Sequence, residues 1–165
     1  MPAKTIDRTP SADPYPLLIK NLLRNPVRQF PKQEIVYGDF RRQTYRELGE
    51  RVGRLASGLA GLGIKPGDTV AVMDWDSHRY LECFFAVPML GAVLHTVNIR
   101  LSPEQILYTI NHAEDDVILL NAEFLPILET IRDRIEPVKK LVLLNDADAA
   151  PTTVLDIATD YEALL

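Results

Sequence analysis

The stretch GAVLHTVNIRLSPEQI, Gly91 to Ile106, joins a short apolar run directly to a marked helix start. The run 92–97 has the length and composition of a buried strand. Ser102, with a proline after it and Gln105 at the third position, is typical of a helix N-terminus, and it predicts a helix to about residue 113. A strand that leads straight into a helix is the building unit of an α/β protein.

The same alternation continues on both sides of this stretch. Three further apolar runs of four or five residues predict strands, and none of them alternates with polar residues as a half-exposed strand would. The strands are expected at 69–73, 117–120 and 141–144, with helices at 45–62, 78–90 and 124–135. This pattern predicts an α/β fold, with a mostly parallel sheet covered by helices on both faces.

The helix expected after Thr44 has the strongest pattern in the chain. Thr44 and Glu47 form a capping box, and Gly63 is a helix stop. A second row along this helix has only small residues, Gly49, Gly53, Ala56 and Ala60, and could let another backbone approach closely. Its apolar stripe consists of Tyr45, Leu48, Val52, Leu55, Leu59 and Leu62.

The first forty-four residues are expected to be more loosely organised. Residues 1–16 contain four prolines and predict an extended arm, so the α/β subdomain is expected over 17–165. Residues 15–30 read as a helix that Pro26 should break or kink after Asn25. The segments 34–37 and 41–44 predict a hairpin.

The end of the chain predicts one more helix. From Asp156 to Leu165 an apolar side consists of Ile157, Tyr161, Leu164 and Leu165. This pattern has no cap, which favours a chain that has been cut within an element.

Composition excludes some classes of function. The chain has 165 residues, 47% hydrophobic and 25% charged, with a net charge of -5, which argues against a general nucleic-acid binder. Residues 20–54 carry nine basic and four acidic side chains, and residues 104–165 carry four basic and thirteen acidic ones. Solvated helix faces are the simpler interpretation; the alternative is a basic face that meets a partner or an anionic lipid surface, formed by Lys20, Arg24 and Arg28.

The expected cellular location depends on the single cysteine and on the length of the apolar segments. The single cysteine, Cys83, cannot form an internal disulfide and lies in an apolar run, which favours a buried structural thiol. The N-terminus has no apolar signal core, and the longest apolar stretch is too short to span a bilayer. A reduced, cytoplasmic location is the default expectation.

Two groups of polar residues are candidates for chemistry. Ligands of open parallel sheets bind beyond the carboxyl ends of the strands, and there the chain has His95, Thr96, Asn98 and Arg100. The alternative is a satisfied histidine, a turn asparagine and a surface arginine. The alternation of Asp74, Asp76 and His78 resembles metal-ligand spacing but equally fits a strand that ends in a helix cap.

No complete catalytic set follows from the residues alone. The glycines of 58–63 end a helix and precede a strand, which is the reverse of the order that presents amides to phosphate. No Gly-rich phosphate loop and no nucleophile elbow occur in the sequence. No residue is therefore assigned as catalytic, cofactor-binding or metal-ligating.

Read in order, the segments resemble the N-terminal part of the acyl-adenylate-forming, AMP-binding enzymes. The resemblance covers Leu17 to about Leu144, and Leu94 to Asp115 is most similar to medium- and long-chain fatty acyl-CoA synthetases. Asp76 stands where the family usually has asparagine, and Ile99 where proline is common. The matching motifs are TYREL at 44–48, KPGDTVAVM at 65–73 and GAVLHTVN at 91–98.

The resemblance implies a fatty acid–CoA ligase that uses ATP, Mg²⁺ and CoA. The family's phosphate loop, its nucleotide and magnesium residues and its catalytic lysine have no matching position here. The resemblance therefore implies an inactive N-terminal fragment that binds none of these ligands itself, and it makes the segment from His95 to Arg100 mainly scaffold. It also allows a homodimer or peripheral membrane contact. The alternative is a naturally short, non-enzymatic binding or oligomerisation module.

Overall fold

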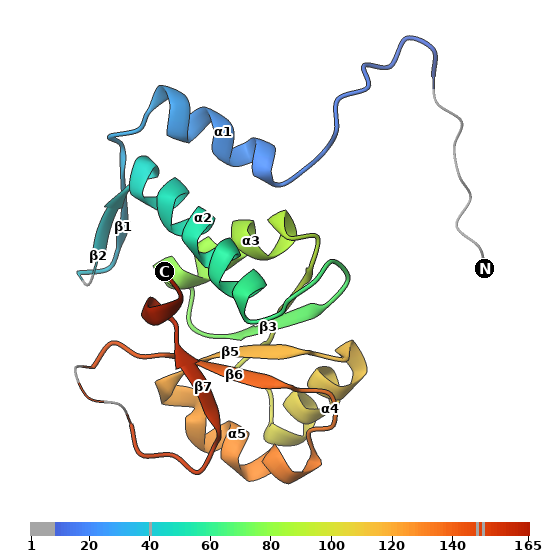
Figure 1. Cartoon of the computed structure of the whole chain (residues 1–165), viewed down its shortest axis with the longest axis vertical. Helices are drawn as coiled ribbons and strands as arrows, with labels where there is room; N and C mark the ends of the chain where they lie inside the picture. Colours follow the sequence, from blue (N-terminus) through green and yellow to red (C-terminus); the bar gives the residue numbers. More distant parts are fainter. Residues whose placement is uncertain (1–8, 40, 148, 150) are drawn as a thin grey trace.

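The computed structural model describes residues 9–39, 41–147, 149 and 151–165. Five parallel strands form one sheet in the order β4-β3-β5-β6-β7 (Figure 1). Because β4 lies on one side of β3 and β5 on the other, the direction of winding reverses between β3 and β5. The strands are β3 (Thr69–Met73), β4 (Val93–Thr96), β5 (Val117–Asn121), β6 (Lys140–Leu144) and β7 (Ile157–Asp160).

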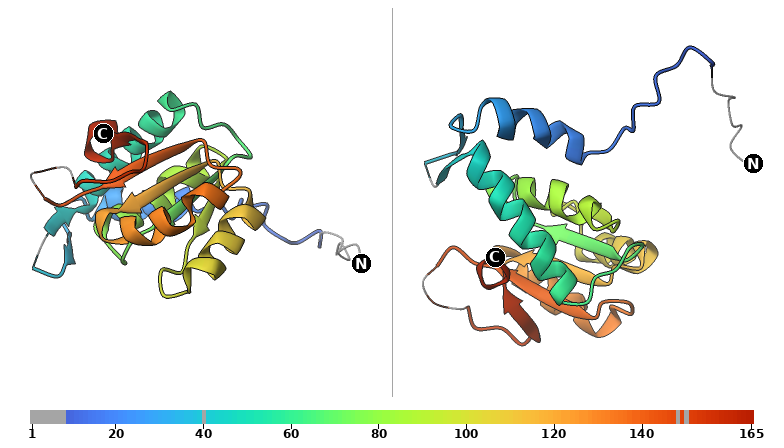
Figure 2. Two further views of the ribbon diagram at one scale, coloured as in Figure 1. Left: turned by 90° about the horizontal axis from the view of Figure 1, so that it is seen from below. Right: turned by 45° about the horizontal axis from the view of Figure 1, so that its top comes forward.

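Helices cover both faces of the sheet, which confirms the predicted fold class (Figures 1 and 2). Helices α2 and α3 lie on one face, and α4 and α5 lie on the other. The 3-10 turns η1 (Ala122–Phe124) and η2 (Arg132–Arg134) flank α5, so the helix expected at 124–135 is three shorter pieces. The four helices are α2 (Tyr45–Gly61), α3 (His78–Met89), α4 (Pro103–Ala113) and α5 (Leu125–Ile131).

The central strand shows why the strands read as continuous apolar runs. Successive side chains of a strand point to opposite faces. Val70 and Val72 of β3 pack with the α2 and α3 side, whereas Ala71 and Met73 pack with the α4 and α5 side. All four side chains are fully buried, so neither face tolerates a polar residue.

The helix starts follow the predicted local chemistry. Thr44 Oγ1 accepts from the Glu47 amide at 3.2 Å, and the Glu47 carboxylate accepts from the Thr44 amide at 2.7 Å. Ser102 and Gln105 form the same reciprocal pair at the start of α4. Both capping boxes satisfy amides that the first turn leaves without partners, so both helix starts could be predicted.

The N-terminal helix differs from the prediction. Helix α1 (Lys20–Gln29) begins five residues later than expected and continues through Pro26. Residues 9–16 form no helix or strand. The helix lies on the surface with no buried residue, so water can serve the carbonyl group that Pro26 leaves without a donor. After it, β1 (Glu34–Tyr37) and β2 (Arg41–Thr44) form the predicted antiparallel hairpin.

The helix predicted at the end of the chain is wrong. Residues Ile157–Asp160 form β7 at the edge of the sheet, and Glu162–Leu164 form the 3-10 turn η3. The pairing with β6 satisfies the backbone there, and the strand ends where Tyr161 enters the core with no exposed area. The three- and four-residue spacing of apolar side chains arose from an edge strand followed by a turn, not from one helix face.

The turn η3 packs closely against α2, at a glycine outside the predicted row of small residues. A Cβ added to Gly58 would lie 2.5 Å from the Leu164 carbonyl oxygen, whereas nothing lies within 4 Å of a Cβ at Gly53.

Within the described residues, no helix combines the length and apolar character that crossing a membrane requires.

Replacing Gly58 with alanine should therefore destabilise the fold, although alanine favours a helix by about 1 kcal/mol. The forced displacement of η3 should outweigh that gain and give a net loss of roughly 1 to 2 kcal/mol. Gly53→Ala is the matched control and should stabilise by up to about 1 kcal/mol. Urea unfolding of both variants measures the difference, and equal stabilisation by both would contradict the close contact.

Candidate site at the carboxyl edge of the sheet

Two polar side chains meet at the point where the winding reverses. Asp74 follows β3 and Asn121 ends β5, so both lie at the carboxyl edge, where open sheets bind ligands. Asn121 Nδ2 donates to Asp74 Oδ1 at 2.7 Å, and Ser77 Oγ donates to the other carboxylate oxygen. Asp74 is buried, and this burial raises the pKa of its carboxyl group.

The neighbouring residues extend this arrangement to both sides. Ser77 Oγ caps α3 by accepting from the amides of Arg79 and Tyr80. Trp75 Nε1 donates to Glu123 at 2.9 Å. The chain's own polar side chains thus join β3 and β5 through hydrogen bonds, and the arrangement of Asp74, Ser77 and Asn121 is called the seam below.

An open hollow of about 270 Å³ lies beside the seam, towards β4. Its polar walls include Asp76, Asn98 and Arg100, whose side chains are exposed. Asn98 Oδ1 accepts from the Arg100 amide at 3.1 Å, so the asparagine shapes the turn itself. These side chains can hydrogen-bond a small polar molecule, and among the described residues that line the hollow no nucleophile is paired with a base.

His95 is absent from this hollow, although its neighbours Thr96, Asn98 and Arg100 line it. The His95 ring faces Asp115, with its Nδ1 2.8 Å from the carboxylate, and Asp115 has no exposed area. The alternative interpretation, a histidine satisfied within the fold, therefore holds for His95. Three of the four residues that the sequence predicted for this edge line the hollow, and His95 does not.

The three residues with metal-like spacing do not share one site. Asp74 belongs to the seam, whereas Asp76 and His78 both line a hollow beside the hairpin, where Asp76 is exposed. Over the described ranges, no group of three or more His, Cys, Asp or Glu side chains is placed to hold a metal ion. Cys83 is fully buried, and this burial raises the pKa of its thiol, as expected for a structural cysteine.

An ion cluster that the sequence did not predict joins α2, α3 and the last residues. Arg51 Nε contacts Glu82 at 2.7 Å and its Nη1 contacts Glu162 at 2.9 Å, while Arg79 Nε contacts Glu162 at 3.1 Å. Tyr161 donates its hydroxyl to Glu82 at 2.8 Å. Burial alone would raise the pKa of Glu162, but the two arginines lower it to about 2. No local pattern signals these pairs, because their partners lie 31 to 111 residues apart.

Acid should destabilise the protein first through His78. Burial, followed by the charges of Arg79, Arg41 and Arg51, lowers the pKa of His78 from 6.5 to about 4. The unfolded chain therefore binds a proton at this position between pH 6.5 and 4 that the folded chain does not, and the free energy of unfolding falls as pH falls through this window. The loss should reach about 3 kcal/mol by pH 4.

Thermal unfolding between pH 7 and 4 measures this loss. His78→Gln keeps a neutral polar side chain of similar length and should flatten the profile in that window. Glu162, whose pKa is lowered, should add its own loss only at more acidic pH. An unchanged profile in His78→Gln would show that other groups cause the acid sensitivity.

Residues 23–164 match the protein-family model described as AMP-binding enzyme. The chain is 42% identical over 130 residues to a long-chain-fatty-acid–CoA ligase of Thermus thermophilus, covering 76% of this chain and 24% of that protein. It is 37% identical over 153 residues to a medium-chain-fatty-acid–CoA ligase of Ectopseudomonas oleovorans, covering 90% of this chain and 28% of that protein.

Comparison with solved structures shows that a CoA ligase contains the same fold. The crystal structure of an anthranilate CoA ligase in complex with anthranoyl-AMP matches with a TM-score of 0.70 and 28% identity, over 75% of this chain and 24% of that one. The chain thus spans about a quarter of the length of these relatives.

Proposed function

The chain belongs to the AMP-binding enzyme family, and from this premise we propose that it is the N-terminal part of a fatty acid–CoA ligase. The whole enzyme would join a fatty acid to CoA with the conversion of ATP to AMP and diphosphate. The observation that supports this most strongly is the 42% identity to a long-chain-fatty-acid–CoA ligase over three quarters of the chain.

The glycine-rich segment 58–63 does not have the arrangement that a nucleotide phosphate needs, and the described residues hold no group of three or more His, Cys, Asp or Glu placed for a metal ion. A phosphate group needs several backbone amides that converge at a loop or helix start, and the glycine-rich segment 58–63 instead ends α2. Gly58 faces Leu164, so the lack of a side chain there serves packing. We therefore derive no chemical step from these residues, and we propose that ATP, Mg²⁺ and CoA are bound by other parts of the whole enzyme.

The proposed role of this chain is to hold the sheet and its carboxyl edge in a fixed shape. The seam of Asp74, Ser77 and Asn121 ties β3, α3 and β5 together. The ion cluster ties the last residues to α2 and α3. A frame of this kind would hold the hollow near Asn98 and Arg100 in place against the other parts of the whole enzyme. This agrees with the scaffold role that the resemblance implies.

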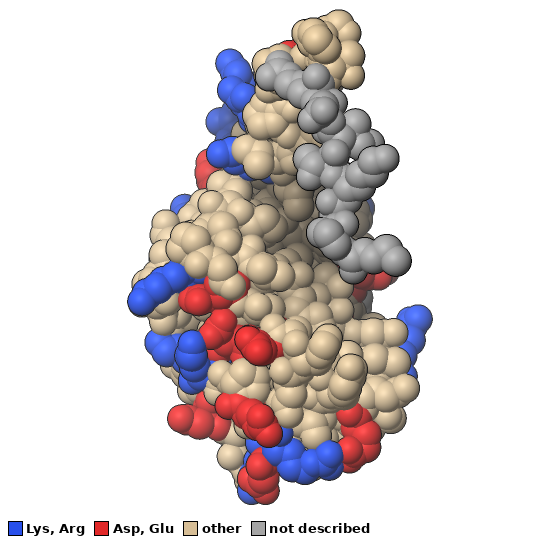
Figure 3. All heavy atoms as spheres, turned by 90° about the vertical axis from the view of Figure 1, so that its right-hand side faces the viewer, with Lys and Arg blue, Asp and Glu red and all other residues tan. Residues whose placement is uncertain are grey.

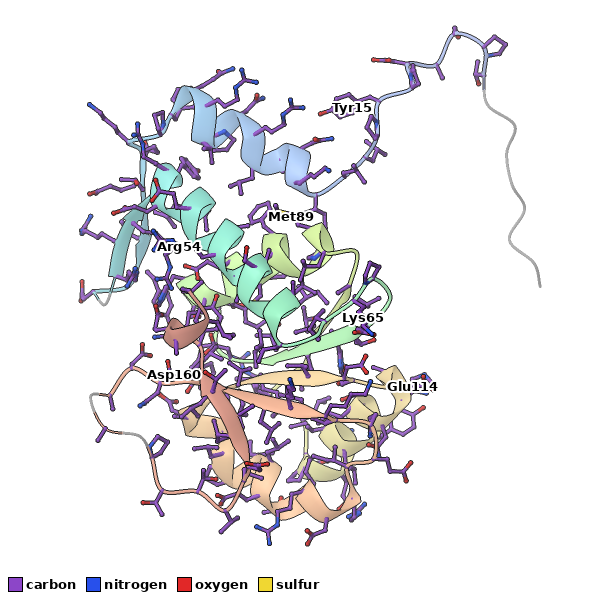
Figure 4. All side chains as sticks on the ribbon, viewed as in Figure 1. Tyr15, Arg54, Lys65, Met89, Glu114 and Asp160 are labelled. Atoms are coloured by element: carbon purple, nitrogen blue, oxygen red, sulfur yellow. The ribbon has the colours of Figure 1, made fainter. Side chains whose placement is uncertain are left out.

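The surface of α1 is the part that we propose for contacts with a second copy or with a membrane surface. Leu22 is 71% exposed, and Lys20, Arg24 and Arg28 flank a groove between α1 and α2. On the face seen in Figure 3, charged side chains of both signs are interspersed over the lower part of the molecule, whereas those near α1 are mostly basic. Figure 4 places Met89, at the end of α3, beneath the start of this helix.

The cellular location that we propose for the protein is the cytoplasm.

The coding sequence beyond Leu165 tests the proposed function. We expect the reading frame to continue into a Ser/Thr/Gly-rich loop that ends in Pro-Lys-Gly. A stop codon directly after Leu165 would refute the ligase proposal for the natural product. It would favour the alternative, a short non-enzymatic binding or oligomerisation module on the same scaffold.

A further inference from the structure

A second hollow, of about 260 Å³, lies between the β1–β2 hairpin and the start of α3. Asp76 and Tyr80 line both this hollow and the one near Asn98, and the ligase proposal assigns no role to this second hollow. Its wall is mainly apolar, from side chains such as Ile35, Leu81 and Phe84. Three nitrogen-bearing side chains, Arg41, Gln43 and His78, complete the lining.

Gln43 and His78 are buried, Arg41 is partly buried, and each has a buried polar atom without a partner. Gln43 is 3% exposed and His78 is 7% exposed. Both amide atoms of Gln43, both ring nitrogens of His78 and Nε of Arg41 have no hydrogen-bond partner among the described residues. Folded proteins rarely leave a buried polar atom unpaired, so a cluster of five such atoms around one hollow indicates a missing partner.

The other buried polar groups of the chain make the contrast clear. Asp74 receives hydrogen bonds from Ser77 and Asn121, and Glu82 receives them from Arg51 and Tyr161. The chain thus satisfies its buried carboxylates with its own side chains. The exceptions gather at this hollow, where all three groups can donate a hydrogen bond.

Charge favours an anion as the missing partner. Within the described part of the chain, Arg41 has no carboxylate within ion-pair distance, whereas its neighbour Arg42 pairs with Glu34. The acidic residue that lines the hollow is Asp76, which is exposed and can turn to water. A carboxylate in the hollow would accept from Arg41, Gln43 and His78 together.

We propose that this hollow binds a small monocarboxylate with a short apolar tail. The carboxylate would lie against Arg41, Gln43 and His78, and the tail against Leu81 and Phe84. A cavity of roughly 150 Å³ holds a benzene-sized molecule, so this one can take an acid of about six carbons. The site stands whether or not the whole protein is a ligase.

Hexanoate is the probe that we would use, with NMR of the isotope-labelled 165-residue chain as the readout. We expect saturable shifts of the Gln43 side-chain amide and the His78 ring, with a dissociation constant of ~1 mM or lower. Hexanamide, which has the same length and no charge, should bind at least about tenfold more weakly.

Three variants locate the site. Gln43→Leu and Arg41→Met should each weaken hexanoate binding by about tenfold or more. Because neither removes a hydrogen bond that the described residues make, both should fold, and their melting temperatures check this. Arg42→Met is the matched control, since Arg42 is the next residue, is exposed and does not line the hollow.

Three results would overturn the proposal. The first is the absence of saturable shifts at Gln43 and His78 up to about 20 mM hexanoate, a concentration well above the expected dissociation constant. The second is equal binding of hexanamide, and the third is binding that survives both Gln43→Leu and Arg41→Met. Ordered water alone would then be the partner of these side chains.

Discussion

Arg51→Met should destabilise the chain by about 3 to 5 kcal/mol, a large share of the 5 to 15 kcal/mol that holds a typical domain together. Glu82 has no exposed area, and Arg51 contacts both of its carboxylate oxygens, at 2.7 and 3.2 Å. Without Arg51 the Glu82 carboxylate keeps the hydrogen bond from the Tyr161 hydroxyl and loses its counter-ion, and a buried charge without a counter-ion is strongly unfavourable. Urea unfolding followed by circular dichroism measures the loss.

A double variant distinguishes two causes of the expected loss of stability, namely the unpaired buried charge of Glu82 and the lost packing of the Arg51 side chain. Arg51→Met with Glu82→Met removes both charges and should recover most of the stability, because apolar replacements of a buried ion pair are often neutral. Arg132→Met is the control, since Arg132 pairs with Asp133 on the surface and its loss should change stability by less than about 1 kcal/mol. A loss below 1 kcal/mol in Arg51→Met would contradict the structural role of the cluster.

His95→Ala should destabilise the chain by about 3 kcal/mol at pH 8 and by less at pH 5. Asp115 is fully buried and its carboxylate faces His95. Burial already raises the pKa of Asp115, and loss of His95 raises it further. The unfolded carboxyl group then ionises at lower pH than the folded one, so the variant loses stability as pH rises above about 4.

Melting curves of His95→Ala at pH 5 and pH 8 test whether the variant loses more stability at the higher pH. Adding Asp115→Asn should remove the difference between the two pH values, because the carboxyl group that faces position 95 is then gone. His112→Ala is the control, since His112 is exposed and stacks on Tyr108 at the surface. A larger loss at pH 5 than at pH 8 would contradict the account of His95.

Features with local causes could be predicted from the sequence. The helix starts at Thr44 and Ser102 depend on residues three positions apart, and the structure confirms both. The strand 69–73 is buried on both faces, so its composition alone identifies it. The family could be identified because an ordered set of motifs, and not any single residue, carries the resemblance.

Features that depend on distant partners could not be predicted. The partner of His95 lies 20 residues away and that of Arg51 lies 31 residues away, and no spacing rule joins such positions. Strand β7 forms because β6 offers it a free edge, whereas its own four residues are only partly buried and carry no clear alternation. The seam of Asp74 and Asn121 likewise requires the strand order, which places β3 beside β5.

ATP–pyrophosphate exchange in the presence of Mg²⁺ and decanoate tests the central claim most directly. We would compare the 165-residue chain with the product of the extended reading frame at equal concentration. The account predicts exchange by the longer product and none above a protein-free blank by the 165-residue chain. Exchange catalysed by the 165-residue chain itself would contradict the claim that it is a scaffold without the adenylating machinery.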